Sequence, residues 1–111
     1  MFKGKNVWVK KLKVTQSQEP FDYLVLTPTE NMAVEVKEWK SKGKFYPKHR
    51  IAPHQIAGLE RFQSIGKHFK SYFFINIVRY NQFLIPYMTF DCDRSYTKDS
   101  FMAEYYEFLY K

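Results

Sequence analysis

Two acidic residues and one lysine in the first third of the chain have the types and spacing needed for metal-assisted phosphate chemistry. Asp22 lies at the start of an apolar run that ends at Leu26, and Glu35 and Lys37 lie in a second apolar run after a turn. Alternate residues of a strand share one face, so the side chains of Glu35 and Lys37 point the same way. If the two runs pair as a hairpin, Asp22 approaches Glu35. Two carboxylates beside a lysine favour a hard-cation site with a positive charge ready for a phosphate.

Both acids interrupt segments that otherwise have the composition of buried strands. Asp22 lies within the apolar segment 21–26, and Glu35 directly follows Ala33 and Val34. An acid-x-Lys pattern by itself is weak, because strand ends often carry such residues only for solubility. A carboxylate inside an apolar strand, however, costs free energy unless it is paired or used. The positions of the two acids therefore strengthen the pattern.

Length and charge indicate one domain, spanning residues 1–111, with a polyanionic partner. The chain has 111 residues, 45% of them hydrophobic, and a formal net charge of +7. That length suits a single domain with its own core. The lysines gather in residues 1–13 and 37–50, on either side of the candidate site. This clustering favours a nucleic acid as the partner, and the alternative is a well-solvated basic surface.

Aromatic residues are more numerous than one small core comfortably holds. The sequence contains nine Tyr and eleven Phe, and aromatic residues make up 20% of it. Some of these rings are therefore expected to contact a second subunit or nucleic-acid bases. The fourth and fifth strands and the last helix are the expected dimer interface.

Other candidate chemistry is weaker. Cys92 is the only cysteine, which excludes an intrachain disulfide, and the three histidines lack the spacing of a zinc site. Asp91 and Asp93 are interpreted as a solvated turn at a strand end. The sequence shows neither a signal peptide nor an apolar run long enough to span a membrane, so a cytoplasmic, reducing location is expected.

The elements that would position these residues follow the order β-β-β-α-β-β-α. Strands are expected at residues 7–14, 21–26, 32–37, 72–78 and 83–90, a basic loop at 41–53, and helices at 53–66 and 100–110. Pro86 is expected to make the last strand an edge or a bulge. The pattern predicts an α/β fold with a small mixed sheet flanked by helices.

With these elements in place, the chain resembles the PD-(D/E)XK nuclease superfamily, which has the restriction-endonuclease-like fold. The matching residues are Asp22, then twelve residues, then Glu35-Val36-Lys37. The chain is similar, more narrowly, to the RecU-type Holliday junction resolvases in residues 35–40, at Phe45 and at 54–56, and the similarity covers about residues 18–80. The stalk insertion of those resolvases has no counterpart, and the first strand is expected close to the start of this sequence, where the superfamily usually has a helix.

This resemblance implies a Mg²⁺-dependent endodeoxyribonuclease, with Mn²⁺ as a substitute metal. Asp22, Glu35 and the backbone carbonyl of Val36 would bind the metal. Lys37 would orient or deprotonate the attacking water, and Gln55 would hydrogen-bond the lysine, the water or the phosphate. The implied substrate is branched DNA, most specifically a four-way junction, and a homodimer would supply two symmetric cuts.

Twelve residues are expected to contact DNA: Lys10, Lys11, Lys13, Trp39, Lys40, Lys42, Lys44, Phe45, Tyr46, Lys48, Arg50 and His54. The aromatic residues among them have two interpretations, since they either stack on bases at a branch point or anchor their loop on the core. His54 is interpreted as a capping residue or a DNA-backbone contact. Two alternatives to a junction resolvase remain, a nuclease of restriction or repair specificity and a non-catalytic nucleic-acid-binding module. The complete acid, acid-x-Lys set argues against the second.

Overall fold

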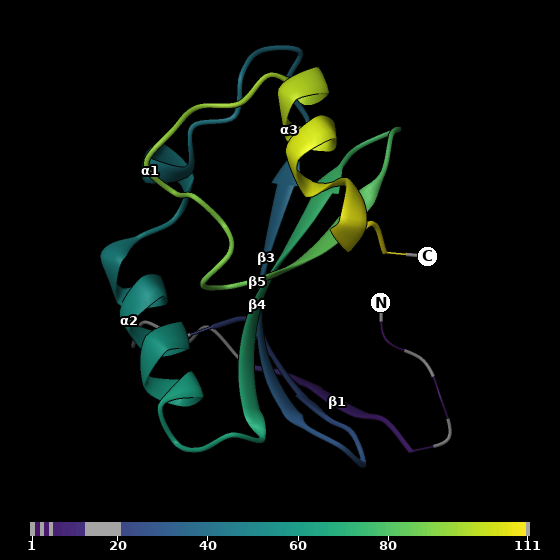
Figure 1. Ribbon diagram of the computed structural model, residues 1–111, viewed down its shortest axis with the longest axis vertical. Coiled ribbons are helices and arrows are strands. Elements are labelled where there is room, and N and C mark those ends of the chain that lie inside the picture. The colour runs from purple at the N-terminus through teal and green to yellow at the C-terminus, as the bar shows by residue number, and fades with distance from the viewer. Residues whose placement is uncertain (1, 3, 5, 13–20, 111) are drawn as a thin grey trace.

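A five-stranded mixed sheet with helices packed on one face forms the fold in the computed structural model, which describes residues 2, 4, 6–12 and 21–110 (Figure 1). The strands are β1 (Trp8–Lys11), β2 (Tyr23–Leu26), β3 (Asn31–Trp39), β4 (Phe69–Ile77) and β5 (Gln82–Pro86). The helices are α1 (Pro47–Arg50), α2 (Pro53–Gln63), α3 (Lys98–Tyr105) and the 3₁₀ helix η1 (Tyr106–Phe108). This architecture confirms the predicted α/β fold with a small mixed sheet.

The strands lie across the sheet in sequence order, and one connection sets its topology. The pairs β1–β2, β2–β3 and β4–β5 are antiparallel, whereas β3 and β4 are parallel. Parallel neighbours need a crossover connection, and α1 and α2 supply it. Because the crossover returns over the sheet, α2 packs on β3 and β4, where Leu59 is fully buried. The same arrangement brings the N-terminal turn of α2 to the middle of β3.

Alternation along β3 and β4 divides the buried residues between the two faces of the sheet. Ala33, Trp39 and Phe73 lie on the face covered by α2 and α3, in the larger buried cluster. Val34 and Phe74 belong to the smaller cluster on the opposite face. This period of two is the pattern expected of strands buried on both sides.

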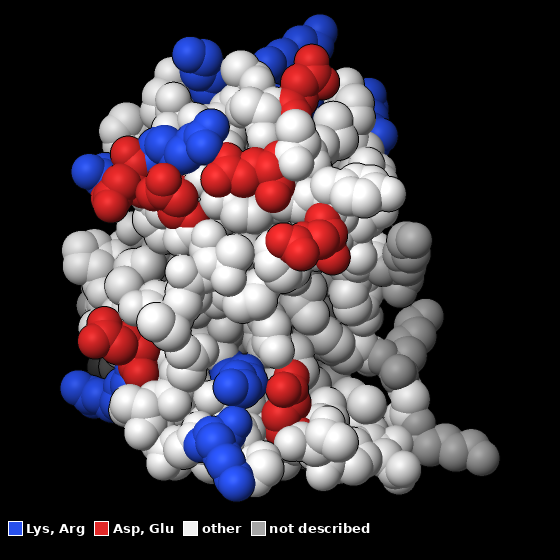
Figure 2. Space-filling model, in the orientation of Figure 1, with Lys and Arg blue, Asp and Glu red and all other residues white. Residues whose placement is uncertain are grey.

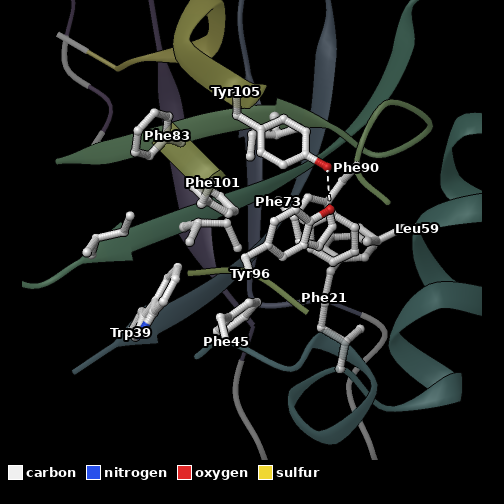
Figure 3. Close-up of a cluster of buried hydrophobic side chains, with 14 of the residues drawn as sticks. Phe21, Trp39, Phe45, Leu59, Phe73, Phe83, Phe90, Tyr96, Phe101 and Tyr105 are labelled. Atoms are coloured by element: carbon white, nitrogen blue, oxygen red, sulfur yellow. Dashed lines mark hydrogen bonds between the residues drawn. The ribbon is translucent and has the colours of Figure 1, made fainter. Parts of the chain in front are cut away.

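Aromatic side chains build most of the larger cluster (Figure 3). Phe90, Tyr96, Phe101 and Tyr105 pack against one another with ring centroids 4.9 to 6.2 Å apart. The hydroxyl oxygens of Tyr96 and Tyr105 lie 2.7 Å apart, and both bond the backbone of Asp91. Much of the aromatic excess therefore fills the core of one chain. This arrangement weakens the composition argument for a dimer interface at these elements.

Most element boundaries differ by a few residues from the sequence-based expectation, and three of the differences have a visible cause. Residues 47–50 form α1 inside the expected loop, with Pro47 at the first helical position and Arg50 at the last. Strand β5 ends at Pro86 instead of residue 90, because proline lacks the N–H that would continue the ladder. The last helix begins earlier, at Lys98, where the hydroxyl of Thr97 accepts a bond from Ser100 N–H at 3.1 Å.

Candidate active site

The hairpin of β2 and β3 brings Asp22 next to Glu35, as the sequence predicted. Tyr23 pairs with Val34 in the ladder, so Asp22, one residue before β2, lies opposite Glu35. The Asp22 N–H donates to the Val34 carbonyl at 3.1 Å, and its Oδ2 accepts from the Val36 N–H at 2.8 Å. The Asp22 carboxylate therefore accepts the Val36 N–H bond that a backbone carbonyl of a longer β2 would otherwise accept. Its orientation is set by the sheet itself.

Glu35 is buried and its carboxylate is held from two sides. The Lys37 ammonium lies 3.1 Å from Glu35 Oε2, and the Gln55 side-chain amide donates to the same oxygen at 2.9 Å. Gln55 Oε1 in turn accepts from the Ala52 N–H at 2.9 Å, which caps the start of α2. Because Gln55 is bound at both ends, it links the first turn of α2 to β3. The expectation that Glu35 and Lys37 share a face is confirmed.

One oxygen of Glu35 lacks a partner. Glu35 is 1% exposed, and its Oε1 has no hydrogen bond to any part of the chain that the structure describes. Burial, reinforced by the nearby charge of Asp22, raises the pKa of Glu35 to about 7, and the Lys37 ammonium opposes that rise. An additional cation beside Oε1 would satisfy the oxygen and favour the ionised carboxylate. This orphaned oxygen is the feature that fits a bound metal.

The backbone of β3 supplies a third oxygen on the same edge. The Val34 carbonyl, the Val36 N–H and the Glu38 carbonyl all bond groups on the side of β3 that faces β2. Alternate residues of a strand direct their backbone groups to the same side, so the Val36 carbonyl also points there. Within the described ranges, no group of three or more His, Cys, Asp or Glu side chains is placed to hold a metal ion. The candidate donors are therefore two carboxylates and one carbonyl, hard oxygen ligands that suit Mg²⁺.

An open cleft of about 690 Å³ leads to this site, and basic side chains surround it. Its lining residues are Lys11, Asp22, Tyr23, Val36, Lys37, Glu38, Lys40, Ser41 and Arg50. Arg50 is held in place, since its Nη2 donates to the Glu38 carbonyl at 2.7 Å and its guanidinium carbon lies 5.6 Å from the Phe45 ring centroid. Three of the cations expected to contact DNA, Lys11, Lys40 and Arg50, thus share the cleft with Asp22 and Lys37. Glu35 is buried and is not among the residues that line it.

Two of the aromatic residues expected to contact DNA are core residues instead. Trp39 and Phe45 are 0% and 1% exposed, and their rings stack with centroids 5.3 Å apart. The Trp39 indole N–H donates to the Gly43 carbonyl at 3.1 Å and thereby closes the loop after β3. Anchoring of the loop is the interpretation that the structure bears out for both. Tyr46, in contrast, is 47% exposed and stacks on His49.

The other described residues that were expected to contact DNA lie outside the cleft. Lys42 and Lys44 are exposed around a depression at the start of α3, and Lys10 is exposed on β1. Lys48, within α1, lies 3.5 Å from Asp93 and does not line the cleft. His54 lines a separate depression along α2 with Phe21 and Phe62. Lys13 lies outside the described residues.

Three residues of the cleft wall were not among the site residues predicted from the sequence. Tyr23 lies under the Lys11 ammonium, which is 6.0 Å from its ring centroid, and Ser41 and the exposed Glu38 line the cleft beside Lys40. Their positions next to Asp22, Lys37 and Lys40 in the sequence were the available signal. Sequence periodicity does not identify them, because the residues of a cleft wall come from the ends of several strands and do not repeat along one face of a single element.

The crossover helix, the sheet order and the site on β2 and β3 together define the restriction-endonuclease-like fold. The structure is similar to that of Hjc from Archaeoglobus fulgidus, a Holliday junction resolvase from an archaeal hyperthermophile, with a TM-score of 0.62 and 13% sequence identity. The match covers 88% of this chain and 79% of that one. At this identity the likeness shows the fold. The likeness does not single out the RecU-type resolvases.

Sequence comparison adds no closer assignment. No family model matches the chain, and no curated protein matches it. Among the described residues, no helix is both long and apolar enough to cross a membrane.

Proposed function

We propose that this protein is a metal-dependent DNA endonuclease of the PD-(D/E)XK superfamily that hydrolyses phosphodiester bonds in four-way junctions. The observation that carries the proposal is the unpartnered, buried Oε1 of Glu35 beside Asp22 and Lys37. A buried carboxylate without a compensating partner costs free energy, so a site that keeps one needs a function for it. The basic cleft and the resolvase-like fold support DNA as the substrate.

Some residues of the site would bind a metal cation, and others would contact the phosphate and the attacking water. Asp22, Glu35 and the Val36 carbonyl would hold Mg²⁺, which supplies positive charge to offset the charge that develops on the phosphate. The Lys37 side chain is 15% exposed, so its ammonium meets both Glu35 and the cleft. From there it orients the attacking water and donates to a phosphate oxygen. Gln55 keeps the Glu35 carboxylate in place.

The cations of the cleft bind the DNA backbone on either side of the reacting phosphate. Lys11 and Lys40 are exposed and line the cleft, and Arg50 is already oriented by Glu38 and Phe45. Contacts of this kind position DNA without reading its sequence. Tyr46, which is exposed on the same helical turn as His49, extends the contact beyond the cleft.

The first test is cleavage of labelled four-way junction, linear duplex and single-stranded DNA with Mg²⁺ and with EDTA. We expect cleavage of the junction with Mg²⁺ and none with EDTA. Asp22→Asn, Glu35→Gln and Lys37→Ala should each reduce the cleavage rate by a factor of about 100 or more. Glu38→Gln is the matched control, because Glu38 is an exposed acid of the same cleft. Equal losses in all four variants would contradict the assignment of roles.

The same assay separates the alternatives. Faster cleavage of linear duplex than of junctions would identify a nuclease of restriction or repair specificity. DNA binding without any cleavage, with either Mg²⁺ or Mn²⁺, would identify a non-catalytic binding module.

We also propose that the active form is a homodimer. Resolution of a four-way junction needs two symmetric cuts, and a two-fold dimer supplies two active sites. Analytical ultracentrifugation at micromolar concentration tests this point. A single species at the chain mass of 13.5 kDa, with and without junction DNA, would contradict it.

A further inference from the structure

The turn between β4 and β5 presents an aromatic ring and two cations at the end of the sheet. Tyr80 is 59% exposed, and Arg79 beside it is exposed as well. The Lys98 ammonium, from the start of α3, lies 4.7 Å from the centroid of the Tyr80 ring. A single exposed tyrosine is ordinary on a protein surface. A tyrosine with a cation on its ring and another next to it has the composition of a site for a nucleobase and its phosphates.

The backbone of this turn is held tightly in an unfavourable conformation. The Ile77 N–H donates to the Asn81 carbonyl, and the Tyr80 N–H donates to the Ile77 carbonyl, both at 2.9 Å. Arg79 has φ 70°, in the left-handed region that residues other than Gly, Asn and Asp rarely adopt. Glycine would fit this position with less strain. The chain therefore carries a long cationic side chain at the tip of the hairpin at a cost in stability, which points to a use for that side chain.

The register of the sheet places this turn close to the candidate active site. Lys37 pairs with Ile75, and the Val78 N–H donates to the Trp39 carbonyl at 3.1 Å. The three residues from Ile75 to Val78 span roughly 10 Å along the strand, and β4 lies about 5 Å from β3. This distance corresponds to roughly three base steps of duplex DNA. A nucleic acid that contacts Lys37 would therefore span the distance to the start of the turn within a few nucleotides.

Further cations connect the cleft to the turn. Lys42 and Lys44 line one depression with Lys98, and Asp99 is the acid among its lining residues. The loop after β3, the start of α3 and the β4–β5 turn all lie at the upper end of the molecule in Figure 1, and Figure 2 shows Lys and Arg side chains along that rim. Lys40 continues the positive charge into the cleft. These cations, with Asp99 among them, gather next to Tyr80, which the Lys98 ammonium contacts.

We infer that Tyr80 is a stacking platform for an unpaired base, with Arg79 and Lys98 holding the phosphates on either side of it. The inference rests on the proposed function and gives its site a preference for DNA with unpaired bases near the cut over continuous duplex. A base can stack on Tyr80 only if one face of the base is free. Inside a continuous duplex both faces of each base are already stacked on its neighbours. Trp39 and Phe45 cannot provide the platform because they are buried.

Binding measured in EDTA tests this inference apart from cleavage. The probe is a duplex with three unpaired nucleotides, one of them the fluorescent base 2-aminopurine, and the reference is the continuous duplex. Tyr80→Ala should weaken binding of the probe about 5- to 100-fold and abolish quenching of the fluorescent base, with the affinity for continuous duplex unchanged. Tyr80→Phe should keep both properties. Tyr106→Ala, which removes a tyrosine 75% exposed on η1, should resemble the wild type.

Arg79 provides a second, independent measurement. Arg79→Gly should leave the melting temperature unchanged or higher, since glycine tolerates the left-handed backbone. Arg79→Gly should weaken binding of the probe, whereas Arg79→Lys, which keeps the positive charge, should keep most of the wild-type affinity. A loss of affinity that accompanies a loss of stability would show a structural role instead.

The outcomes distinguish this inference from the proposed function. If Tyr80→Ala and the wild type prefer the probe equally, or if Tyr80→Ala weakens continuous duplex as much as the probe, the platform is wrong, whereas Mg²⁺-dependent cleavage would still uphold the nuclease. If the wild-type protein binds neither DNA at low salt, both proposals fail.

Discussion

Glu35 is unfavourable in the folded chain, and its neighbours offset that cost only in part. Lys37 and Gln55 both bond Oε2, which leaves Oε1 buried and unpartnered. Asp22 adds a second negative charge beside the same carboxyl group. A core that needed only packing would place an apolar residue here. The energetic cost at this one residue is therefore the strongest sign that the site binds something positive.

The first prediction concerns the stability of the metal-free protein. The pKa of Glu35 is raised from 4.5 to about 7 in the fold, so the folded state binds more protons than the unfolded state between these values. Stability from this group is thus present below about pH 4.5 and is lost as the pH rises through about 7. Glu35→Gln keeps the shape without the charge. We expect it to increase the free energy of unfolding at pH 8 by about 3 kcal/mol and to change it little at pH 4.5.

Urea unfolding in EDTA at both pH values measures this difference. Glu38→Gln serves as the control, because Glu38 is half-exposed and should show the same small effect at both pH values. An equal effect of Glu35→Gln at pH 4.5 and pH 8 would show that the fold does not raise the pKa of the Glu35 carboxyl.

The second prediction concerns the metal. A ligand that binds only the folded state stabilises it, by about 2.7 kcal/mol at a concentration 100 times its dissociation constant. Mg²⁺ should therefore raise the melting temperature of the wild type, and chelation should reverse the increase. Asp22→Asn and Glu35→Gln should lose this response, whereas Lys37→Ala should keep it because the lysine does not bind the metal. A Mg²⁺ response that survives in Asp22→Asn would place the metal elsewhere.

At the scale of elements, the loop after β3 depends on buried aromatic rings. Trp39 stacks on Phe45 and meets Phe101 edge to face, and its indole N–H bonds the Gly43 carbonyl. Arg50 then lies over the outer side of Phe45. The position of the basic loop and of a cleft cation is therefore set from the core.

The third prediction follows from this anchoring. Trp39→Ala should lower the free energy of unfolding by about 3–5 kcal/mol, the range for large aromatic residues in cores. Tyr46→Ala, a few residues along in the chain but 47% exposed, should change it by less than about 0.5 kcal/mol. Chemical denaturation compares the two variants. Similar small effects would mean that the loop is not anchored through Trp39.

The strands of the site could be predicted from the sequence because their signal is local. Alternation puts Glu35 and Lys37 on one face, and the short turn makes the hairpin that brings Asp22 to them. The same alternation places Trp39 on the α2 face, but its lysine-rich surroundings left two interpretations open, contact with DNA and anchoring on the core. Helix α1 has four residues, too few for helical periodicity to be visible. Proximity of loops such as that of Lys44 and Lys98 depends on tertiary packing, and no sequence spacing records it.

At the scale of the molecule, the positive charge is divided between the cleft and other surfaces. Lys11 and Lys40 line the cleft that Asp22 and Lys37 also line. Lys48 is paired with Asp93 beyond α1, and Lys67 is exposed in the connection between α2 and β4. Net charge alone attracts any polyanion, whereas a cleft binds DNA at defined phosphates. The lysines of the cleft are therefore expected to contact defined phosphates of the DNA, and the lysines on other surfaces only to contribute to the net charge.

The last prediction separates these two contributions through the salt dependence of binding. Each phosphate contact on duplex DNA contributes a slope of roughly −0.9 to the plot of log affinity against log salt concentration. Lys11→Ala combined with Lys40→Ala should therefore make the slope less negative by roughly 1.8 and weaken binding to all sequences alike. Lys48→Ala combined with Lys67→Ala removes the same net charge and should leave the slope almost unchanged. Fluorescence anisotropy across a salt series measures both double variants in EDTA. Equal slopes for the two would mean that DNA responds to the overall charge of the molecule rather than to the cleft, and the phosphate contacts assigned to Lys11 and Lys40 would then be wrong.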